Sequence, residues 1–294
     1  MGNRKINSIV KSDVQWLIDK AYEDHYKYER QNKIKVILSD MFERALEDDL
    51  ISKNPCKGVI IRTEKQVKAK ALTVEEQSVF FEFCKNTFYD NLFNIAVNTG
   101  LRPGELFALT REDVDMGNGF IDVNKTLVYQ KYLTDERKTF HVEPPKTKQS
   151  YRKVPINSVC RKYLEKQFEL KTLVSNKRPK EQNDFLFVTT FNTPLNSVIY
   201  SDAIRSIIRK INETRSLDDA FPFFSGHTFR HTFATRCFEN GIQAKVVQSY
   251  LGHASLKMTM DLYTHVLEDK LSTDIEKIVP NVKDNVVSFK GKTA

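Results

Sequence analysis

Apolar residues recur at helical spacing in two long stretches near the start of the chain. One face of the segment VQWLIDKAY carries Val14, Leu17, Ile18 and Tyr22. The segment KIKVILSDMFERALEDDLI repeats the pattern with Ile34, Ile37, Leu38, Met41, Phe42, Ala45 and Leu46. Asn54-Pro55 closes this block, because a residue before proline resists the helical conformation. The pattern predicts a helical domain over residues 1–62.

A basic segment without a sustained period separates this block from the rest of the chain. The stretch KGVIIRTEKQVKAKAL is rich in lysine and arginine, and we place a linker at residues 63–72. Thr73-Val74-Glu75-Glu76 then has the pattern of a capping box, which indicates that a new helix begins there. The sequence therefore predicts a domain boundary in the linker.

The second block, residues 73–270, alternates helical and strand patterns. A helix over 90–98 is expected to stop near Gly100, and another to begin at Pro103, a favoured first helical position. Four strand-like segments follow over 120–156, and DFLFVT indicates a short strand or turn. Further helices are expected over 158–173, 196–211, 227–239 and 242–251 and from 256 onward. The predicted fold class is mainly α with a small antiparallel β-sheet, an α+β domain, preceded by the N-terminal helical domain.

Composition narrows the choice of partners and compartments. Lysine and arginine number 46 against 38 acidic residues, and a net charge of +8 attracts polyanions. The cysteines, Cys56, Cys84, Cys160 and Cys237, are too scattered for a disulfide framework or a zinc knuckle. The sequence has no apolar run of the roughly 18 residues that a membrane span needs, and no signal peptide. The scattered cysteines favour a cytoplasmic protein.

Four segments carry side chains suited to chemistry on phosphate. They are TGLRPGELFALTREDVD with Arg102, PPKTKQSYRKVPI with Lys146 and Lys148, GHTFRHTFAT with His227 and Arg230, and LGHASLKMTMDLYTH with His253 and Tyr263. Each has an ordinary interpretation when taken alone, such as a capping arginine, a solvated lysine or a tyrosine at the edge of a core. Their order and spacing along one chain need a common explanation.

The first two segments resemble the tyrosine recombinase (phage integrase) family, in particular the integrases of mobile elements. The family's first arginine stands in T-G-x-R-x-x-E-x-x-x-L, which is matched by Arg102 and Glu105 in the segment from Thr99 to Leu109. The family then has a lysine in a β-hairpin, matched by Lys146.

The last two segments complete the resemblance. The family motif H-x-x-R-H is matched from His227 to His231 and includes Arg230, and L-G-H ends at His253. The nucleophilic tyrosine lies ten residues later, at Tyr263. The resemblance extends from about residue 73 to residue 266.

The resemblance implies a reaction that moves a DNA phosphodiester onto Tyr263 and forms a 3′-phosphotyrosine. Arg102 and Arg230 would each donate paired hydrogen bonds to phosphate oxygens, and Lys146 would protonate the leaving 5′ oxygen. His227 would assist deprotonation of the tyrosine, while His253 would bind the scissile phosphate. The intermediate retains the bond energy, so a second 5′ hydroxyl can rejoin the strand without ATP.

Three site assignments have alternatives. Lys148 can replace Lys146 as the general acid, because the sequence does not fix the register of the turn. Glu105 matches the family's acid that orients the first arginine, and the alternative is a solvated first-turn glutamate that the helix dipole favours. Seven basic residues are candidate contacts to the DNA backbone, with a solvated surface as the alternative: Lys57, Arg62, Lys65, Lys68, Lys70, Arg152 and Lys153.

The resemblance implies a bacterial cytoplasmic protein located on DNA, which needs no metal and no cofactor. It also implies partners. Residues 1–62 would bind a core recombination site, residues 73–270 would catalyse, and the tail 271–294 would dock on a neighbouring subunit of a homo-tetramer. An accessory excisionase or a host DNA-bending protein is a further partner of such integrases. Integrases of this kind often carry an arm-binding domain before the core-binding helices, whereas this chain starts almost inside those helices. We expect either a truncated or a naturally short version of such an integrase.

Two rival functions remain at this stage. A catalytically idle DNA-binding regulator would have no need of Tyr263 and Arg230. A type IB topoisomerase shares the chemistry but fits less well with the segment from L-G-H to the tyrosine and with the two-domain length.

Overall fold

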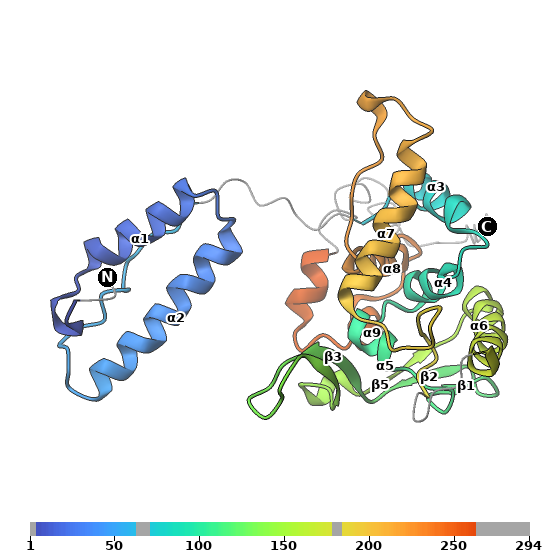
Figure 1. The fold of residues 1–294 in the computed structure, drawn as a ribbon, viewed down its shortest axis with the longest axis horizontal. Coiled ribbons are helices and arrows are strands. Elements are labelled where there is room, and N and C mark those ends of the chain that lie inside the picture. Colours follow the sequence, from blue (N-terminus) through green and yellow to red (C-terminus); the bar gives the residue numbers. More distant parts are fainter. Residues whose placement is uncertain (1–3, 63–70, 178–183, 263–294) are drawn as a thin grey trace, which may run out of the picture. The chain divides into compact units, whose positions relative to one another are not determined.

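The computed structural model describes residues 4–62, 71–177 and 184–262 (Figure 1). By its internal contacts the chain divides into two compact units, Met1–Lys68 and Ala69–Ala294. The division falls in the segment that the sequence analysis assigned to a linker.

The first unit is built on two helices, α1 (Lys11–Glu23) and α2 (Tyr28–Glu47), after the short helix η1 (Ile6–Ser8). Its core consists of Val14, Ile18, Phe42, Cys56 and Val59. The predicted apolar face of α2 is only partly buried, since Ile37 is 69% and Met41 43% exposed. The described part of this unit covers one side of α2. The enclosed residues of α2 are therefore those that face either α1 or the segment 51–61.

The second unit is mainly helical. Among its described helices are α3 (Val74–Cys84), α4 (Asp90–Thr99), α5 (Pro103–Ala108), α6 (Ser158–Lys177), α7 (Ser197–Asn212), η3 (Leu217–Asp219), α8 (His227–Glu239) and α9 (Ala244–Leu251). Helix α4 packs against both α6 and α8, and α3 packs against α7. The centre is aromatic: the ring of Phe80 lies 5.0–5.6 Å from those of Phe93, Phe224 and Phe229. Edge-on ring contacts of this kind fix how the helices pack.

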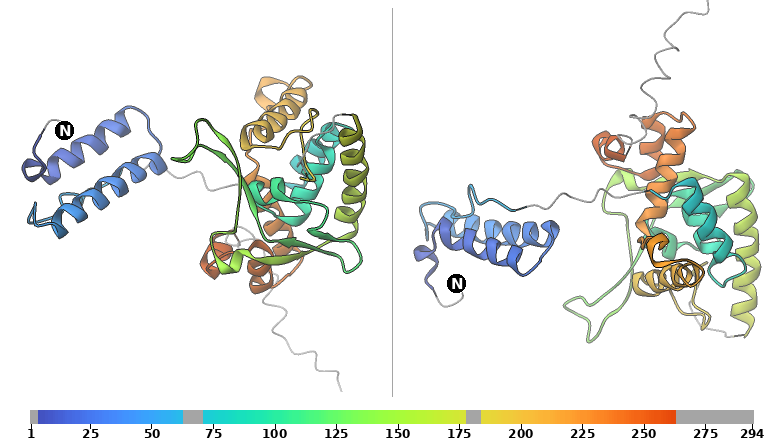
Figure 2. Two further views of the ribbon diagram at one scale, coloured as in Figure 1. Left: turned by 60° about the horizontal axis from the view of Figure 1, so that its bottom comes forward. Right: turned by 90° about the horizontal axis from the view of Figure 1, so that it is seen from above.

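The strands form two separate antiparallel sheets. Strands β1 (Val114–Asp115), β2 (Phe120–Val123) and β5 (Arg152–Pro155) pair in the order β1-β2-β5. Strands β3 (Thr126–Gln130) and β4 (Thr139–Glu143) pair only with each other. Figure 2 shows them as a hairpin arm, residues 126–143, that extends from the second unit. The chain leaves the first sheet after Val123 and rejoins it at Arg152, and these two residues are register partners.

Several local signals in the sequence correspond to observed structure. Thr73 caps α3 through a capping box with Glu76, with bonds of 3.0 and 2.8 Å. Helix α4 ends at Gly100 and α5 begins at Pro103. The predicted fold class, mainly α with small antiparallel sheets and N-terminal helices, is confirmed. A search of the described helices for one long and apolar enough to span a membrane finds none.

Candidate active site

The first catalytic segment is built around a buried carboxylate. Arg102 occupies the N-cap of α5, and its backbone N–H donates to Oε2 of Glu105 at 2.8 Å. The Arg102 guanidinium donates to Oε1 of the same residue, also at 2.8 Å. Glu105 is only 4% exposed, so the interpretation of it as a solvated first-turn residue is wrong. Its two oxygens fix both the backbone and the side chain of Arg102.

A second arginine shares this carboxylate. Arg152, at the start of β5, donates from Nη1 and Nη2 to the two oxygens of Glu105 at 3.0 and 2.8 Å. Its remaining contacts are also internal, and the side chain is 4% exposed. The expectation that Arg152 contacts the DNA backbone is therefore corrected, because its guanidinium is committed inside the domain.

Arg230 joins the ends of two helices. Helices α4 and α9 both stop at a glycine in the left-handed region, Gly100 with φ 63° and Gly252 with φ 62°. Arg230 donates to the carbonyl of Gly100 at 2.8 Å and to that of Leu251 at 2.5 Å. Carbonyls at a helix C-terminus lack intrahelical partners and lie at the negative end of the helix dipole, so they hold a guanidinium well. This buried arginine is thus oriented without any carboxylate of its own.

The end of α9 accepts hydrogen bonds from all three arginines. Three successive carbonyls accept one bond each. The carbonyl of Tyr250 accepts from Arg152 at 2.6 Å, that of Leu251 from Arg230 at 2.5 Å, and that of Gly252 from Arg102 at 3.2 Å. The L-G-H motif therefore has a structural meaning: its backbone gathers the guanidinium groups. The glycine is required both for its left-handed conformation and for space, because a Cβ there would lie 3.0 Å from Cδ of Arg152 and from the carbonyl of Gln149.

The two predicted histidines lie in the field of these arginines. His253 is buried, and its Nδ1 lies 2.9 Å from the hydroxyl of Thr259. Burial, followed by the charges of Arg230 and Arg102, lowers the pKa of His253 to about 4. Desolvation and the same two charges also lower the pKa of His227, at the start of α8. Both imidazoles are consequently neutral near pH 7.

The charges of the gathered residues favour an anion. Burial alone would raise the pKa of Glu105. The hydrogen bonds and charge of Arg152, followed by the charge and backbone hydrogen bond of Arg102, outweigh burial and lower this pKa to about 2. Burial and the neighbouring Arg102 lower the pKa of Arg230 to about 9, so it too stays charged at neutral pH. Three guanidinium groups against one carboxylate leave two positive charges in excess, which suits a phosphate with its negative oxygens.

The two candidate lysines lie on the segment between β4 and β5, residues 144–151, which we call the lysine loop. Lys146 precedes the short helix η2 (Lys148–Ser150), and both lysines are exposed, without a hydrogen-bond partner among the described residues. The expected hairpin is corrected, because β4 and β5 belong to different sheets.

Tyr263, the predicted nucleophile, lies outside the described residues. The nearest competing tyrosines have structural positions. Tyr200 is buried against Phe93 and Phe107, and burial raises its pKa. The ring of Tyr250 lies 6.5 Å from that of Phe233. Neither tyrosine is among the residues that bond to the arginine cluster through a side chain.

The remaining candidate DNA contacts are dispersed. Lys57 and Lys153 are exposed. Arg62 is exposed and lies 3.3 Å from Asp19. Lys65, Lys68 and Lys70 lie outside the described residues.

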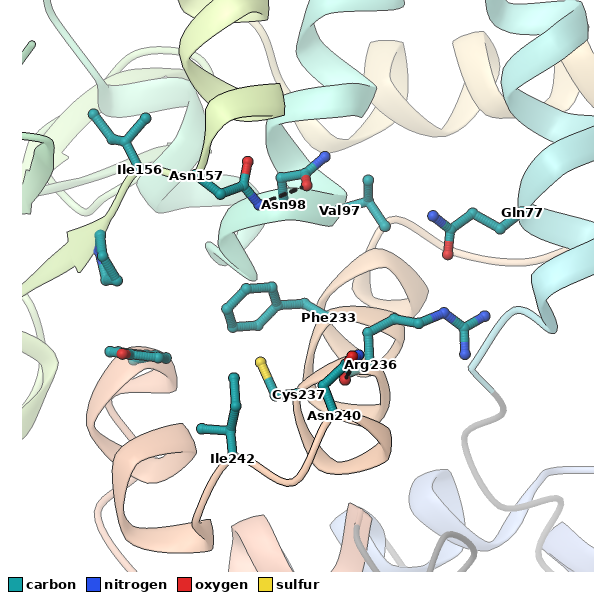
Figure 3. A pocket seen from close by; sticks show the side chains of 12 residues that line it. Gln77, Val97, Asn98, Ile156, Asn157, Phe233, Arg236, Cys237, Asn240 and Ile242 are labelled. Carbon is teal, nitrogen blue, oxygen red and sulfur yellow. Dashed lines mark hydrogen bonds between the residues drawn. The ribbon is translucent and has the colours of Figure 1, made fainter.

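A separate cavity of about 400 Å³ lies between α4, α8, α9 and the turn that follows β5 (Figure 3). Phe233, Cys237 and Ile242 point into it, and Asn98 bonds to Asn157 on its wall at 2.9 Å. No predicted catalytic residue of the described part of the chain lines this cavity. The arginine cluster is therefore distinct from it.

One residue of the site was assigned the wrong role from the sequence, and a signal for its role was present. Burial alternates along β5, with Arg152 and Val154 inside and Lys153 exposed. An arginine on the buried face of a strand needs internal partners. The alternation alone favoured an internal role for Arg152 and an external one for Lys153.

Comparison with known proteins agrees with the fold. Residues 70–270 match the phage integrase family, and the chain belongs to that family. The transposase of transposon Tn916 from Enterococcus faecalis is 29% identical over 95% of this chain and 68% of its own length. A XerC-like tyrosine recombinase from Caldanaerobacter subterraneus is 29% identical over 92% of this chain and 71% of its own. The Tn1549 transposon integrase, solved with transposon right end DNA, is 26% identical with a TM-score of 0.81, over 95% of this chain and 88% of that one.

Proposed function

We propose that the protein is a site-specific recombinase that cleaves and rejoins double-stranded DNA through a 3′-phosphotyrosine on Tyr263, and so integrates or excises a mobile element. The observation that carries the proposal is the gathering of Arg102 and Arg230 at the end of α9, beside the buried His253. Related transposases and integrases of mobile elements support the same activity.

The arginines stabilise the charge that develops on the phosphate. In the transition state the scissile phosphorus carries additional negative charge on its non-bridging oxygens. Arg102 and Arg230 keep guanidinium N–H groups beyond those bonded to Glu105 and to the helix-end carbonyls. Because both groups are already oriented, little reorganisation is needed when the phosphate arrives.

Proton transfer is divided among three side chains. Tyr263 attacks the phosphorus and loses its proton, which the neutral His227 can accept. The bond from phosphorus to the 5′ oxygen breaks, and Lys146, or Lys148 in its place, supplies a proton to that oxygen. His253 bonds to Thr259 through Nδ1, which leaves Nε2 to hydrogen-bond the phosphate. Rejoining is the reverse sequence, with a new 5′ hydroxyl as the nucleophile.

The wider assembly is part of the proposal. Residues 1–62 bind the core site, residues 63–72 link the domains, residues 73–270 catalyse, and residues 271–294 dock on a neighbouring subunit in a tetrameric synapse. An excisionase or a DNA-bending protein sets the direction of recombination, and the reaction takes place on bacterial DNA in the cytoplasm. The net charge of +8 favours association with DNA.

The decisive experiment traps the covalent intermediate. Tyr263→Phe removes only the hydroxyl, so this variant is expected to fold and to bind DNA normally but to form no adduct on a nicked suicide substrate. A phenol with an ordinary pKa near 10 needs the assistance of the site to attack at neutral pH. The wild-type adduct is digested, and the DNA-linked peptide is sequenced. A linkage to Tyr200, Tyr250 or any other tyrosine contradicts the proposed mechanism.

A further inference from the structure

We infer that Arg152 is a positioning residue that holds three catalytic segments together: the first arginine, the L-G-H segment and the lysine loop. The inference rests on the proposed function, because positioning is meaningful only if these segments act on one phosphate. It assigns to Arg152 a role in catalysis without contact to DNA. Each of the three connections is a separate hydrogen bond or pair of bonds.

The first connection passes through Glu105 to Arg102. Arg152 binds both oxygens of Glu105, and the same oxygens bind the backbone N–H and the guanidinium of Arg102. With its side chain 4% exposed, Arg152 is the buried partner of this carboxylate, whereas the side chain of Arg102 is 34% exposed. The buried arginine therefore fixes the carboxylate, and the carboxylate aims the more accessible arginine toward solvent and substrate.

The second connection reaches the end of α9. Nε of Arg152 donates to the carbonyl of Tyr250 at 2.6 Å. Gly252, two residues further on, packs so closely on the Arg152 side chain that a Cβ would lie 3.0 Å from its Cδ. His253 follows directly, so the position of its imidazole depends on where this turn rests against Arg152.

The third connection anchors the lysine loop. Nη1 of Arg152 also donates to the carbonyl of Ser150 at 3.1 Å. Ser150 closes the loop onto Thr147 through a backbone bond of 3.0 Å and a hydroxyl contact of 3.0 Å. Both candidate lysines flank Thr147, so the anchored turn determines where either amine can reach.

Only an arginine can make all these connections at once. Its planar group presents five donors in a fixed fork, and here Nε, Nη1 and Nη2 are all engaged. A lysine offers one rotatable ammonium and cannot bind a bidentate carboxylate and two carbonyls in different directions. Loss of the fork is therefore expected to loosen the lysine loop and Arg102 together.

The test compares two leaving groups in the full-length protein. Arg152→Met is measured in single-turnover cleavage of an ordinary suicide substrate and of one with sulfur in place of the bridging 5′ oxygen. When the phosphorus–sulfur bond breaks, the thiolate leaves without a proton, so a general acid is not needed. Half-site binding and circular dichroism report whether the variant binds and folds. Arg236→Met is the matched control, because Arg236 also caps a carbonyl, that of Leu72, and pairs with Glu239.

We expect Arg152→Met to bind the half-site normally and to cleave the ordinary substrate roughly 100-fold more slowly. The sulfur substrate should recover a clear part of this loss, because the lysine is then dispensable, and the remainder should reflect the misplaced Arg102. Arg236→Met should cleave both substrates at the wild-type rate. If Arg152→Met does not fold, Arg152→Lys keeps the charge without the fork and gives the same comparison.

Two results overturn the inference. One is wild-type cleavage of the ordinary substrate by the folded variant. The other is an equal loss on both substrates, which would show that the lysine loop does not depend on Arg152. A failure of the proposed function looks different, because the wild-type protein would then form no adduct with either substrate.

Discussion

Replacing Glu105 by glutamine tests the centre of the candidate site most directly. The change keeps the shape of the side chain but removes its charge and turns one acceptor oxygen into an NH2 donor. That donor would face the guanidinium groups of Arg102 and Arg152, which are donors only. Arg152 would remain buried with its charge uncompensated.

The expected loss of stability follows from the pKa of the carboxyl group. Glu105 has a pKa of about 2 in the folded protein against an ordinary value of 4.5. Each tenfold change in proton affinity corresponds to about 1.4 kcal/mol, so the charged form contributes about 3 kcal/mol to the free energy of unfolding. Breaking a buried ion pair by removing one partner typically costs about 3–5 kcal/mol, which agrees.

The dependence on pH has a definite sign. Because the folded pKa lies below the unfolded one, the contribution is complete above about pH 4.5 and is lost as the pH falls toward about 2. Glu105→Gln should therefore be less stable than the wild type by about 3 kcal/mol at pH 7. The difference between the two proteins should shrink through this acidic range.

Urea unfolding can be followed separately in the two units. Circular dichroism is dominated by the helices of the second unit, whereas the only tryptophan, Trp16, lies in the first unit. The dichroism transition of Glu105→Gln should move to lower urea, and the fluorescence transition of Trp16 should stay in place. A dichroism transition that is unchanged at pH 7, or a difference that persists undiminished at pH 2, would refute the reasoning.

Three further outcomes are expected. Arg102→Ala and Arg230→Ala should each abolish cleavage in an adduct assay, because each removes on the order of 3 kcal/mol of transition-state stabilisation. Duplex binding in a mobility-shift assay should stay nearly intact. Near wild-type cleavage by either variant would remove that arginine from the mechanism. Excess EDTA should leave cleavage unchanged, and a loss that magnesium restores would indicate a metal-dependent nuclease. Deletion after Asp269 should preserve half-site binding but weaken synapsis, measured as paired duplexes on a native gel. The reason is that the tail carries the apolar residues Val286, Val287 and Phe289. Unchanged synapsis would mean that these residues do not dock on a neighbouring subunit.

Local signals in the sequence predicted most of the helices well. The capping box at Thr73, the stop at Gly100 and the start at Pro103 depend on residues close together in the chain, and the structure reproduces them. Strand pairing was less accessible, because pairing joins distant segments. The four predicted β-segments follow one another in the sequence, but the second and third of them, β3 and β4, form a separate hairpin. The fourth, β5, then pairs with the first, β2.

The site was predicted in its residues but not in its connections. Sequence motifs located Arg102, Arg230 and His253, whereas the fact that α9 binds three arginines through its backbone carbonyls has no side-chain signature. Arg152 was misassigned because a basic run suggests an exposed surface. Only the alternation along β5 marked it as an inward residue, and that signal is short.

The hairpin arm has a base that belongs to the domain and a tip that does not. At its departure Lys125 and Asn124 bind Asp113 at 2.6 and 3.1 Å, and on its return Arg152 binds Glu105. Within the arm, β3 packs against α5 and Leu127 is buried in the core, whereas residues 131–138 are mostly exposed. Only this tip can therefore be lengthened, shortened or exchanged, by evolution or by a protein engineer, without disturbing α5 and the arginine at its N-cap.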